Sequence, residues 1–207
     1  MINSYGELGE QHIDVLREIG NIGAGNAATS LSVMIDEGVQ ISVPQVKILD
    51  YEGVIKSVGD PEDLGIAIMI KYSGDVHGVV LFVLGYNDAK GIADMLIDDP
   101  GAFSQTGLSD MTISAIKEIG NILGSSYLGS ISALTGLNYD ISIPYVSIDM
   151  VGAIMSAPML EFSIDDSKIL IVEESFATEA LSLQSHVILF ADIPSLNRIL
   201  SQLGLEI

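Results

Sequence analysis

The chain has 207 residues, 48% of them hydrophobic, and 28 acidic against 8 basic side chains give it a formal net charge of −20. Contacts to nucleic acids and anionic membranes depend on clustered Lys and Arg, so this balance argues against both as partners. No run of apolar residues approaches the ~18 that a membrane-spanning helix needs, and the first residues lack the pattern of a secretory signal. The chain has no cysteine, which excludes disulfide bonds and thiol chemistry. We expect a cytoplasmic protein.

The first strong pattern along the chain predicts a long helix. Its apolar and small residues recur at spacings of three and four and mark one buried stripe: Ile13, Leu16, Gly20, Gly23, Ala27, Leu31 and Met34. Residues 39–49 alternate as a strand, in which Pro44 indicates an edge or a bulge. Asp50 is placed to cap a short helix, and a hairpin over 65–72 and 76–85 leads to a further helix over 87–97.

The same series returns at an offset of 100 residues. Residues 18–22 and 118–122 are identical, and the match continues through the strand that follows each helix. Asp149, like Asp50, is a candidate cap of a short helix. Residues 168–174 and 185–191 are expected to form the second hairpin, and 194–205 the last helix. We therefore expect one domain over 1–207, with halves of about 8–100 and 108–207 related by a pseudo-twofold axis. The predicted class is α/β, with α+β layers in which long helices pack on a mostly antiparallel sheet.

The repeat also carries a polar motif. It has two copies, in each of which 22 residues separate the Asn from a following proline. These are Asp14, Glu18, Asn21 and Pro44 in the first half and Ser114, Glu118, Asn121 and Pro144 in the second. At 100° per residue, the three helical positions of each copy fall within about 60° of one another, opposite the buried stripe. Like charges four residues apart and a mid-helix Asn do not help a helix, so this polar ridge points to function.

Phosphoryl transfer is one chemistry that suits such a ridge. Catalysis there rests on holding an attacking water in line with the phosphorus, and a neutral amide does this without adding negative charge beside the phosphate oxygens. A carboxylate one turn earlier is suited to pair with a cation on a substrate protein and to fix its docking register.

With both motifs intact, the chain resembles the CheC/CheX/FliY family of response-regulator phosphatases along essentially its whole length, and the CheC branch most. The resemblance implies a CheC-like fold and an enzyme that hydrolyses the aspartyl phosphate of the chemotaxis response regulator CheY at two surfaces. It implies that Asn21 and Asn121 orient the water while Glu18 and Glu118 contact the regulator's lysine. Asp14, Ser114, Pro44 and Pro144 complete the motif.

The resemblance also bears on partners and cofactors. It implies no cofactor or metal bound by this chain, since the Mg²⁺ would belong to CheY, and a second partner in the receptor deamidase CheD. The docking region for CheD resembles residues 148–153, which makes Asp149 the candidate contact, although a helix cap is an equal alternative for this residue. We expect a monomer.

Other functions remain open or are weaker. A non-catalytic adaptor that docks CheY or CheD, or a protein associated with the flagellar switch, would carry the same surfaces. Gly23-x-Gly25-x-x-Ala28 matches a dinucleotide fingerprint only formally, because it lies inside a helical pattern. The three histidines lack ligand partners at metal spacing, Asp98-Asp99 and Asp165-Asp166 lack the pattern of a calcium loop, and no nucleophile elbow supports a serine hydrolase.

Overall fold

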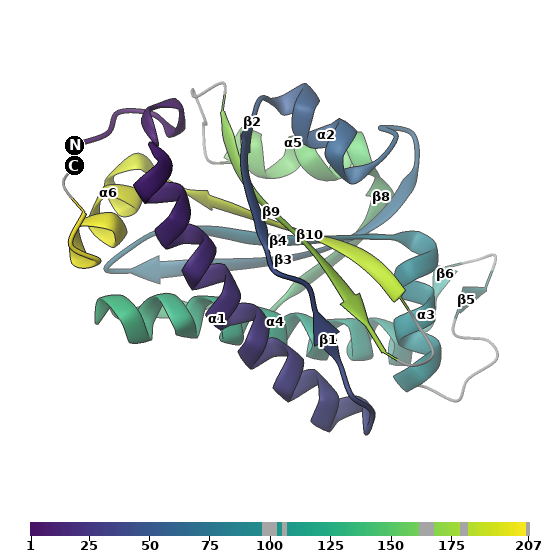
Figure 1. The fold of residues 1–207 in the computed structure, drawn as a ribbon. Coiled ribbons are helices and arrows are strands. Elements are labelled where there is room, and N and C mark those ends of the chain that lie inside the picture. The colour runs from purple at the N-terminus through teal and green to yellow at the C-terminus, as the bar shows by residue number, and fades with distance from the viewer. Residues whose placement is uncertain (97–102, 105–106, 162–167, 179–181, 206–207) are drawn as a thin grey trace.

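The computed structural model describes residues 1–96, 103–104, 107–161, 168–178 and 182–205. Two long helices, α1 (Glu10–Ile35) and α4 (Asp110–Thr135), lie across one face of a curled antiparallel sheet (Figure 1). The shorter helices are α2 (Tyr51–Val58), α3 (Tyr86–Leu96), α5 (Val151–Glu161) and α6 (Ile193–Gln202), and a 3-10 turn at Tyr5–Glu7 precedes α1. The layered α/β fold predicted from the sequence is confirmed.

The main sheet has the strand order β1-β9-β10-β4-β3-β7, with β2 also along β9 and β8 also along β3. Its strands are β1 (Gln40–Ile41), β2 (Gln45–Leu49), β3 (Leu64–Gly74), β4 (Gly78–Gly85), β7 (Tyr139–Ile141), β8 (Tyr145–Met150), β9 (Ile169–Ala177) and β10 (Ser182–Ala191). A separate short pair joins β5 (Phe103–Ser104) to β6 (Gly107–Leu108).

The two halves of the chain exchange their edge strands. The hairpins β3–β4 and β9–β10 meet at the centre of the sheet, where β4 pairs with β10. The first half's β1 and β2 then pair with β9 of the second half, while β7 and β8 of the second half pair with β3 of the first. Each half therefore completes the sheet of the other.

Helices cover both faces of the sheet, so its central strands read as nearly continuous apolar runs. On one face, Ile66, Ile68 and Ile70 of β3 pack into a core with residues of α1, α4 and α6. On the other face, the alternate residue Ala67 joins a smaller core that includes Val54 of α2 and Met155 of α5. This division follows from the period of two in a strand.

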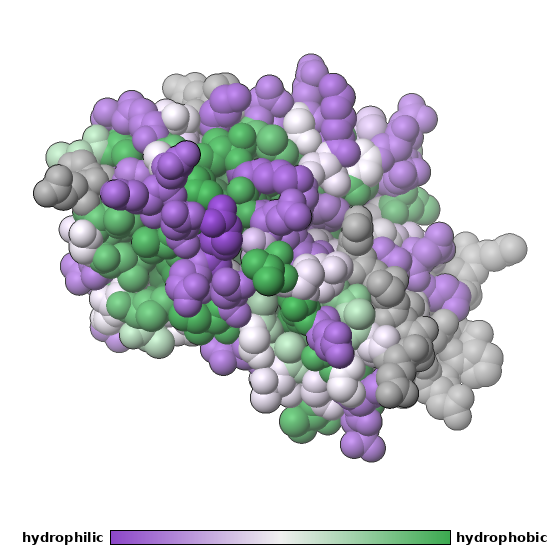
Figure 2. All heavy atoms as spheres, in the orientation of Figure 1, coloured by the Kyte–Doolittle hydropathy of each residue, from purple (hydrophilic) through white to green (hydrophobic). Residues whose placement is uncertain are grey.

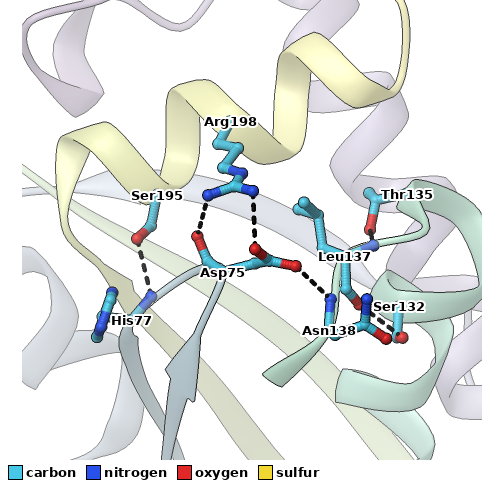
Figure 3. Close-up of polar contacts among 8 residues, drawn as sticks. All are labelled: Asp75, His77, Ser132, Thr135, Leu137, Asn138, Ser195 and Arg198. Atoms are coloured by element: carbon cyan, nitrogen blue, oxygen red, sulfur yellow. Dashed lines mark hydrogen bonds and ion pairs between the residues drawn. The ribbon is translucent and has the colours of Figure 1, made fainter. Parts of the chain in front are cut away.

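The tip of the first hairpin is fastened to two distant elements (Figure 3). Arg198 of α6 donates from Nη2 to Asp75 Oδ1 at 2.8 Å and from Nη1 to the Asp75 carbonyl oxygen at 3.0 Å. The amide of Asn138, between α4 and β7, donates to Asp75 Oδ2 at 2.9 Å. These hydrogen bonds, led by the one from the Asn138 backbone, hold the pKa of Asp75 below its usual range.

Some local features predicted from the sequence are confirmed by the structure and others are wrong. Asp50 caps α2 as predicted, accepting a hydrogen bond from Gly53 N at 2.8 Å. The expected cap by Asp149 is wrong, because this residue lies in β8 and its Oδ1 accepts from the neighbouring Met150 N. Both strands of the second hairpin are longer than predicted, since their ends at 175–177 and 182–184 still pair with each other.

Candidate functional site

Each long helix carries its Glu and Asn on the side away from the sheet. In α1, Glu18 is exposed and Asn21 half-buried, while Ile19 and Gly20 between them are buried. In Figure 2, hydrophilic side chains gather over the first half of α1, where it crosses the front of the molecule. The helical spacing thus produces the polar ridge that the sequence predicts.

The second copy repeats this arrangement on α4. Glu118 and Asn121 are both exposed, and Asn121 Nδ2 donates to Glu118 Oε2 at 3.4 Å. In the part of the chain that the structure describes, Glu18 and Asn21 make no such contact. The structure therefore places Glu18 and Asn21 together on one surface of α1, and Glu118 and Asn121 together on one surface of α4. We call these the first and the second surface.

A glycine and a proline fix each surface against the sheet. Pro44 and Pro144 are buried, and each packs against the glycine that precedes the Asn. A Cβ at Gly20 would lie 3.4 Å from Pro44 Cβ, and one at Gly120 would lie 3.2 Å from Pro144 Cβ. The 22-residue interval between Asn and Pro thus reflects a contact that sets the height of the helix over its edge strand.

Both prolines lie at bulges in the sheet. Ser42 N donates to the Ser175 carbonyl oxygen at 2.9 Å and Gln45 pairs with Glu173, so Val43 and Pro44 together face a single residue, Glu174. Proline suits this position because a bulge leaves a residue outside the ladder, where no N–H is needed.

The bulge at Pro144 repeats this arrangement at the other edge of the sheet. Ser142 N donates to the Lys71 carbonyl oxygen at 2.9 Å and Tyr145 pairs with Met69, so Ile143 and Pro144 face Ile70. Glu174 and Ile70 therefore occupy equivalent places in the two halves.

The first residue of each motif serves its own helix. Asp14 Oδ1 accepts from Arg17 Nη1 at 2.6 Å in an exposed ion pair. Ser114 Oγ donates to the Asp110 carbonyl oxygen at 2.9 Å. Arg17, which sequence reasoning overlooked, offsets the like charges of Asp14 and Glu18. An acidic residue three positions before Arg is the pattern that would have identified this pair.

The two helices cross closely next to the surfaces. Gly23 permits this approach, because a Cβ there would lie 2.9 Å from Tyr127 Cδ1 and 3.1 Å from Tyr127 Cα. Beside the crossing is a hollow of about 420 Å³. Its polar lining comes from both helices and consists of Glu118, Asn121, Ser125 and Ser126 of α4 and Asn26 and Ser30 of α1. The contribution of α1 to the second surface is absent from the repeat pattern, since it depends on the crossing.

A buried carboxyl group lies beneath the crossing. Glu174 is 5% exposed, and its Oε2 accepts a hydrogen bond from the Tyr127 hydroxyl. Burial raises the pKa of Glu174 to about 7, although the bond from Tyr127 opposes the shift. In the part of the chain that the structure describes, Glu174 Oε1 and Ser185 Oγ have no hydrogen-bond partner. Nothing in the repeat predicts this group, because its equivalent is Ile70.

Asp149 lies apart from both surfaces. It is exposed on β8, on the face of the sheet that α5 covers, and it lines a pocket of about 180 Å³ together with Tyr145 and Pro158. Ile143, Tyr145 and Met150 on the same edge of the sheet are exposed at 87%, 62% and 51%. This edge is therefore a second candidate contact region.

The structure also locates the sequence motifs that would indicate other functions. The glycine-rich fingerprint lies inside α1, where it cannot join a strand to a helix. Among the described residues, no three His, Asp or Glu side chains are grouped so as to hold a metal ion. No helix in the described part of the chain is long and apolar enough to cross a membrane. The acidic pairs at 98–99 and 165–166 lie outside the described residues.

Comparison with known proteins agrees with the geometry. The model of the CheC-like family matches residues 12–48 and 111–148, the segments that hold the two motifs. The chain is 30% identical over 203 residues to the CheY-P phosphatase CheC of Bacillus subtilis, covering 97% of both chains. It is 31% identical over 142 residues to the flagellar motor switch phosphatase FliY of Bacillus subtilis, but spans only 37% of that longer protein.

Solved structures share the fold. The crystal structure of Thermotoga maritima FliY superposes with a TM-score of 0.74 at 24% identity, covering 96% of this chain and 98% of that one. The middle domain of FliM from H. pylori superposes with a TM-score of 0.66 at 14% identity, covering 94% of this chain and 99% of that one. At these identities the likeness extends to the fold alone.

Proposed function

Because this chain belongs to the CheC-like family, we propose that it hydrolyses the aspartyl phosphate of the response regulator CheY at the two surfaces on α1 and α4. One observation carries the proposal. Both helices present an exposed Glu and an Asn one turn apart, and each helix is held at a Gly–Pro contact beside its Asn. A chain in which only one copy was functional would not need both to keep this geometry.

The roles of the residues follow from their chemistry. Asn21 and Asn121 orient a water molecule in line with the phosphorus of the docked regulator, since a neutral amide both donates and accepts hydrogen bonds. Water forms the new P–O bond, the bond to the aspartyl oxygen breaks, and the products are a free carboxylate and inorganic phosphate. Glu18 and Glu118 pair with the lysine of the regulator and fix its orientation.

The remaining partners are part of the same proposal. The Mg²⁺ that neutralises the phosphoryl oxygens is held by the regulator. The deamidase CheD binds at the edge of the sheet around Asp149, away from the catalytic surfaces. The protein acts as a monomer in the cytoplasm, and its net charge of −20 keeps the apolar chain soluble.

The decay of phosphorylated CheY with Mg²⁺ tests this function. We expect the protein to accelerate decay, Asn21→Ala and Asn121→Ala each to lower the rate, and the double variant to lose the acceleration. Asn87→Ala, the same change at an exposed Asn on α3, is the matched control. Decay at the regulator's own rate, with binding retained, would make this protein an adaptor. Loss of helical circular dichroism in both Ala variants would make the asparagines structural.

A further inference from the structure

We propose that Asn26, which belongs to the helix of the first surface, serves the second: it positions the phosphorylated regulator beside Glu118 and Asn121. The inference rests on the proposed phosphatase function and assigns a residue to it that lies outside both motifs. Its basis is the hollow between the helices, whose lining joins Asn26 and Ser30 of α1 to the ridge of α4.

The helix crossing explains why α1 reaches the second surface. Gly23 lets the backbone of α1 approach Tyr127, so the next turn of α1 lies over α4. There Asn26 Nδ2 donates to Ser130 Oγ at 3.4 Å, and Ser130 Oγ donates to the Ser126 carbonyl oxygen at 2.6 Å. These contacts hold the exposed amide of Asn26 at the wall of the hollow.

The chemistry of the hollow fits a docked protein. Beyond Glu118, its polar groups are uncharged: the amides of Asn26 and Asn121 and the hydroxyls of three serines. The other polar atoms of the Asn26 amide make no hydrogen bond within the described part of the chain. They are suited to bond the main chain of the regulator loop next to its phosphorylated aspartate, and a neutral amide there does not repel the phosphoryl group.

The two surfaces differ at this position. Residue 126, the repeat equivalent of Asn26, is a serine. Its side chain is shorter than that of asparagine and has fewer hydrogen-bonding atoms. By the repeat, the place that Asn26 takes toward the second surface falls to Ser126 toward the first, while Ser126 itself also lines the hollow at the second surface. We expect the second surface to bind the regulator more tightly and to have the lower KM.

Single-surface proteins test the assignment. Asn21→Ala leaves only the second surface active, and Asn121→Ala leaves only the first. Asn26→Ser, which installs the residue that α4 carries, is made in each background. We expect KM for phosphorylated CheY to rise about three- to tenfold on the second surface with kcat unchanged, as the loss of one intermolecular hydrogen bond implies. On the first surface KM should stay within about twofold.

Two further variants separate positioning from a structural effect. Gln40→Ser makes the same amide-to-hydroxyl change at an exposed residue of β1 and should leave both surfaces unaltered. Asn26→Gln restores an amide and should recover part of the lost affinity of the second surface.

The outcomes distinguish this inference from the function on which it rests. An equal rise of KM in both backgrounds, or a change in kcat alone, shows that Asn26 acts through the helix crossing and overturns the inference. So does an unchanged KM on an active second surface, which leaves the phosphatase function intact. If neither parent protein hydrolyses the phosphate, the proposed function itself fails and the inference falls with it.

Discussion

The hydroxyl of Tyr127 on α4 donates a hydrogen bond to the buried carboxyl group of Glu174 on β9, beneath the point where the two long helices cross. The equivalent position in the other half, Ile70, is apolar and 1% exposed. The core under the helices thus contains an ionisable side chain, Glu174, in the second half and an apolar one, Ile70, at the equivalent place in the first half. No other ionisable side chain among the described residues has an appreciable electrostatic effect on Glu174.

Glu174 makes stability depend on pH. Its pKa is raised in the folded protein to about 7, against a usual 4.5, so the folded state holds its proton more tightly than the unfolded state. Its contribution is full below pH ~4.5 and is lost as pH rises through about 7, by an amount on the order of 3 kcal/mol. We expect Glu174→Gln to be more stable than the parent at pH 8 and to show a flatter pH profile.

Urea unfolding of both proteins between pH 5 and pH 8 measures this effect. The isosteric amide cannot ionise, so the two unfolding curves should differ more at pH 8 than at pH 5. A constant difference across that range would mean that Glu174 is ionised throughout.

The two glycines at the Gly–Pro contacts should respond unequally to alanine. A Cβ at Gly120 would lie 2.4 Å from Ile68 Cγ2, whereas one at Gly20 meets nothing closer than 3.4 Å. We expect Gly120→Ala to destabilise the fold by about 1–3 kcal/mol through overpacking. Gly20→Ala should be neutral or slightly stabilising, because alanine favours a helix over glycine by about 1 kcal/mol. Urea midpoints decide, and equal shifts would contradict the packing described.

The Asp75 junction should make the hairpin tip sensitive to acid. Its hydrogen bonds hold the pKa of Asp75 down, so they stabilise the fold above the usual pKa of an aspartate and are lost as pH falls through the depressed value. Arg198→Met keeps the aliphatic stem but removes both donors. We expect the Tm at pH 7 to fall by about 1–3 °C, a small change because both side chains of the pair are partly exposed.

Hydrogen exchange at the hairpin tip provides the control for that variant. Protection of the Asn138 amide, which donates to Asp75, should persist if Arg198 acts alone. A Tm unchanged at pH 7 would show that the guanidinium adds nothing to the junction.

Asp149→Lys should separate the proposed CheD contact from catalysis. The residue is exposed on the face of the sheet opposite α1 and α4, so a reversed charge there leaves the two surfaces untouched. We expect calorimetry to show weaker binding of CheD and the decay of phosphorylated CheY to be unchanged. Asp140→Lys, the same change at an exposed residue of β7, is the control. Unaltered CheD affinity would remove Asp149 from the interface.

Much of the fold follows from local patterns in the sequence. The buried stripe of α1, the bulge at Pro44, the first hairpin and the cap by Asp50 are all short-range features, and the structure has each of them. The Asp149 cap failed because strand pairing with Gly65 extends β8 past that residue. Pairings between halves, the Tyr127–Glu174 bond and the place of Asn26 depend on contacts about 50 to 140 residues apart, which no periodicity encodes.

The exchanged edge strands also bear on how the chain is made. Among the described strands, β1 and β2 have no neighbour in the sheet until β9, more than 100 residues later, has left the ribosome. Until then Pro44 has no strand to hold it against Gly20, and the N-terminal half displays an unpaired hairpin edge that invites association with other chains. Assembly of the first surface must therefore wait for synthesis of β9, whereas the elements of the second surface, including β8 and its partner β3, have all been made before then.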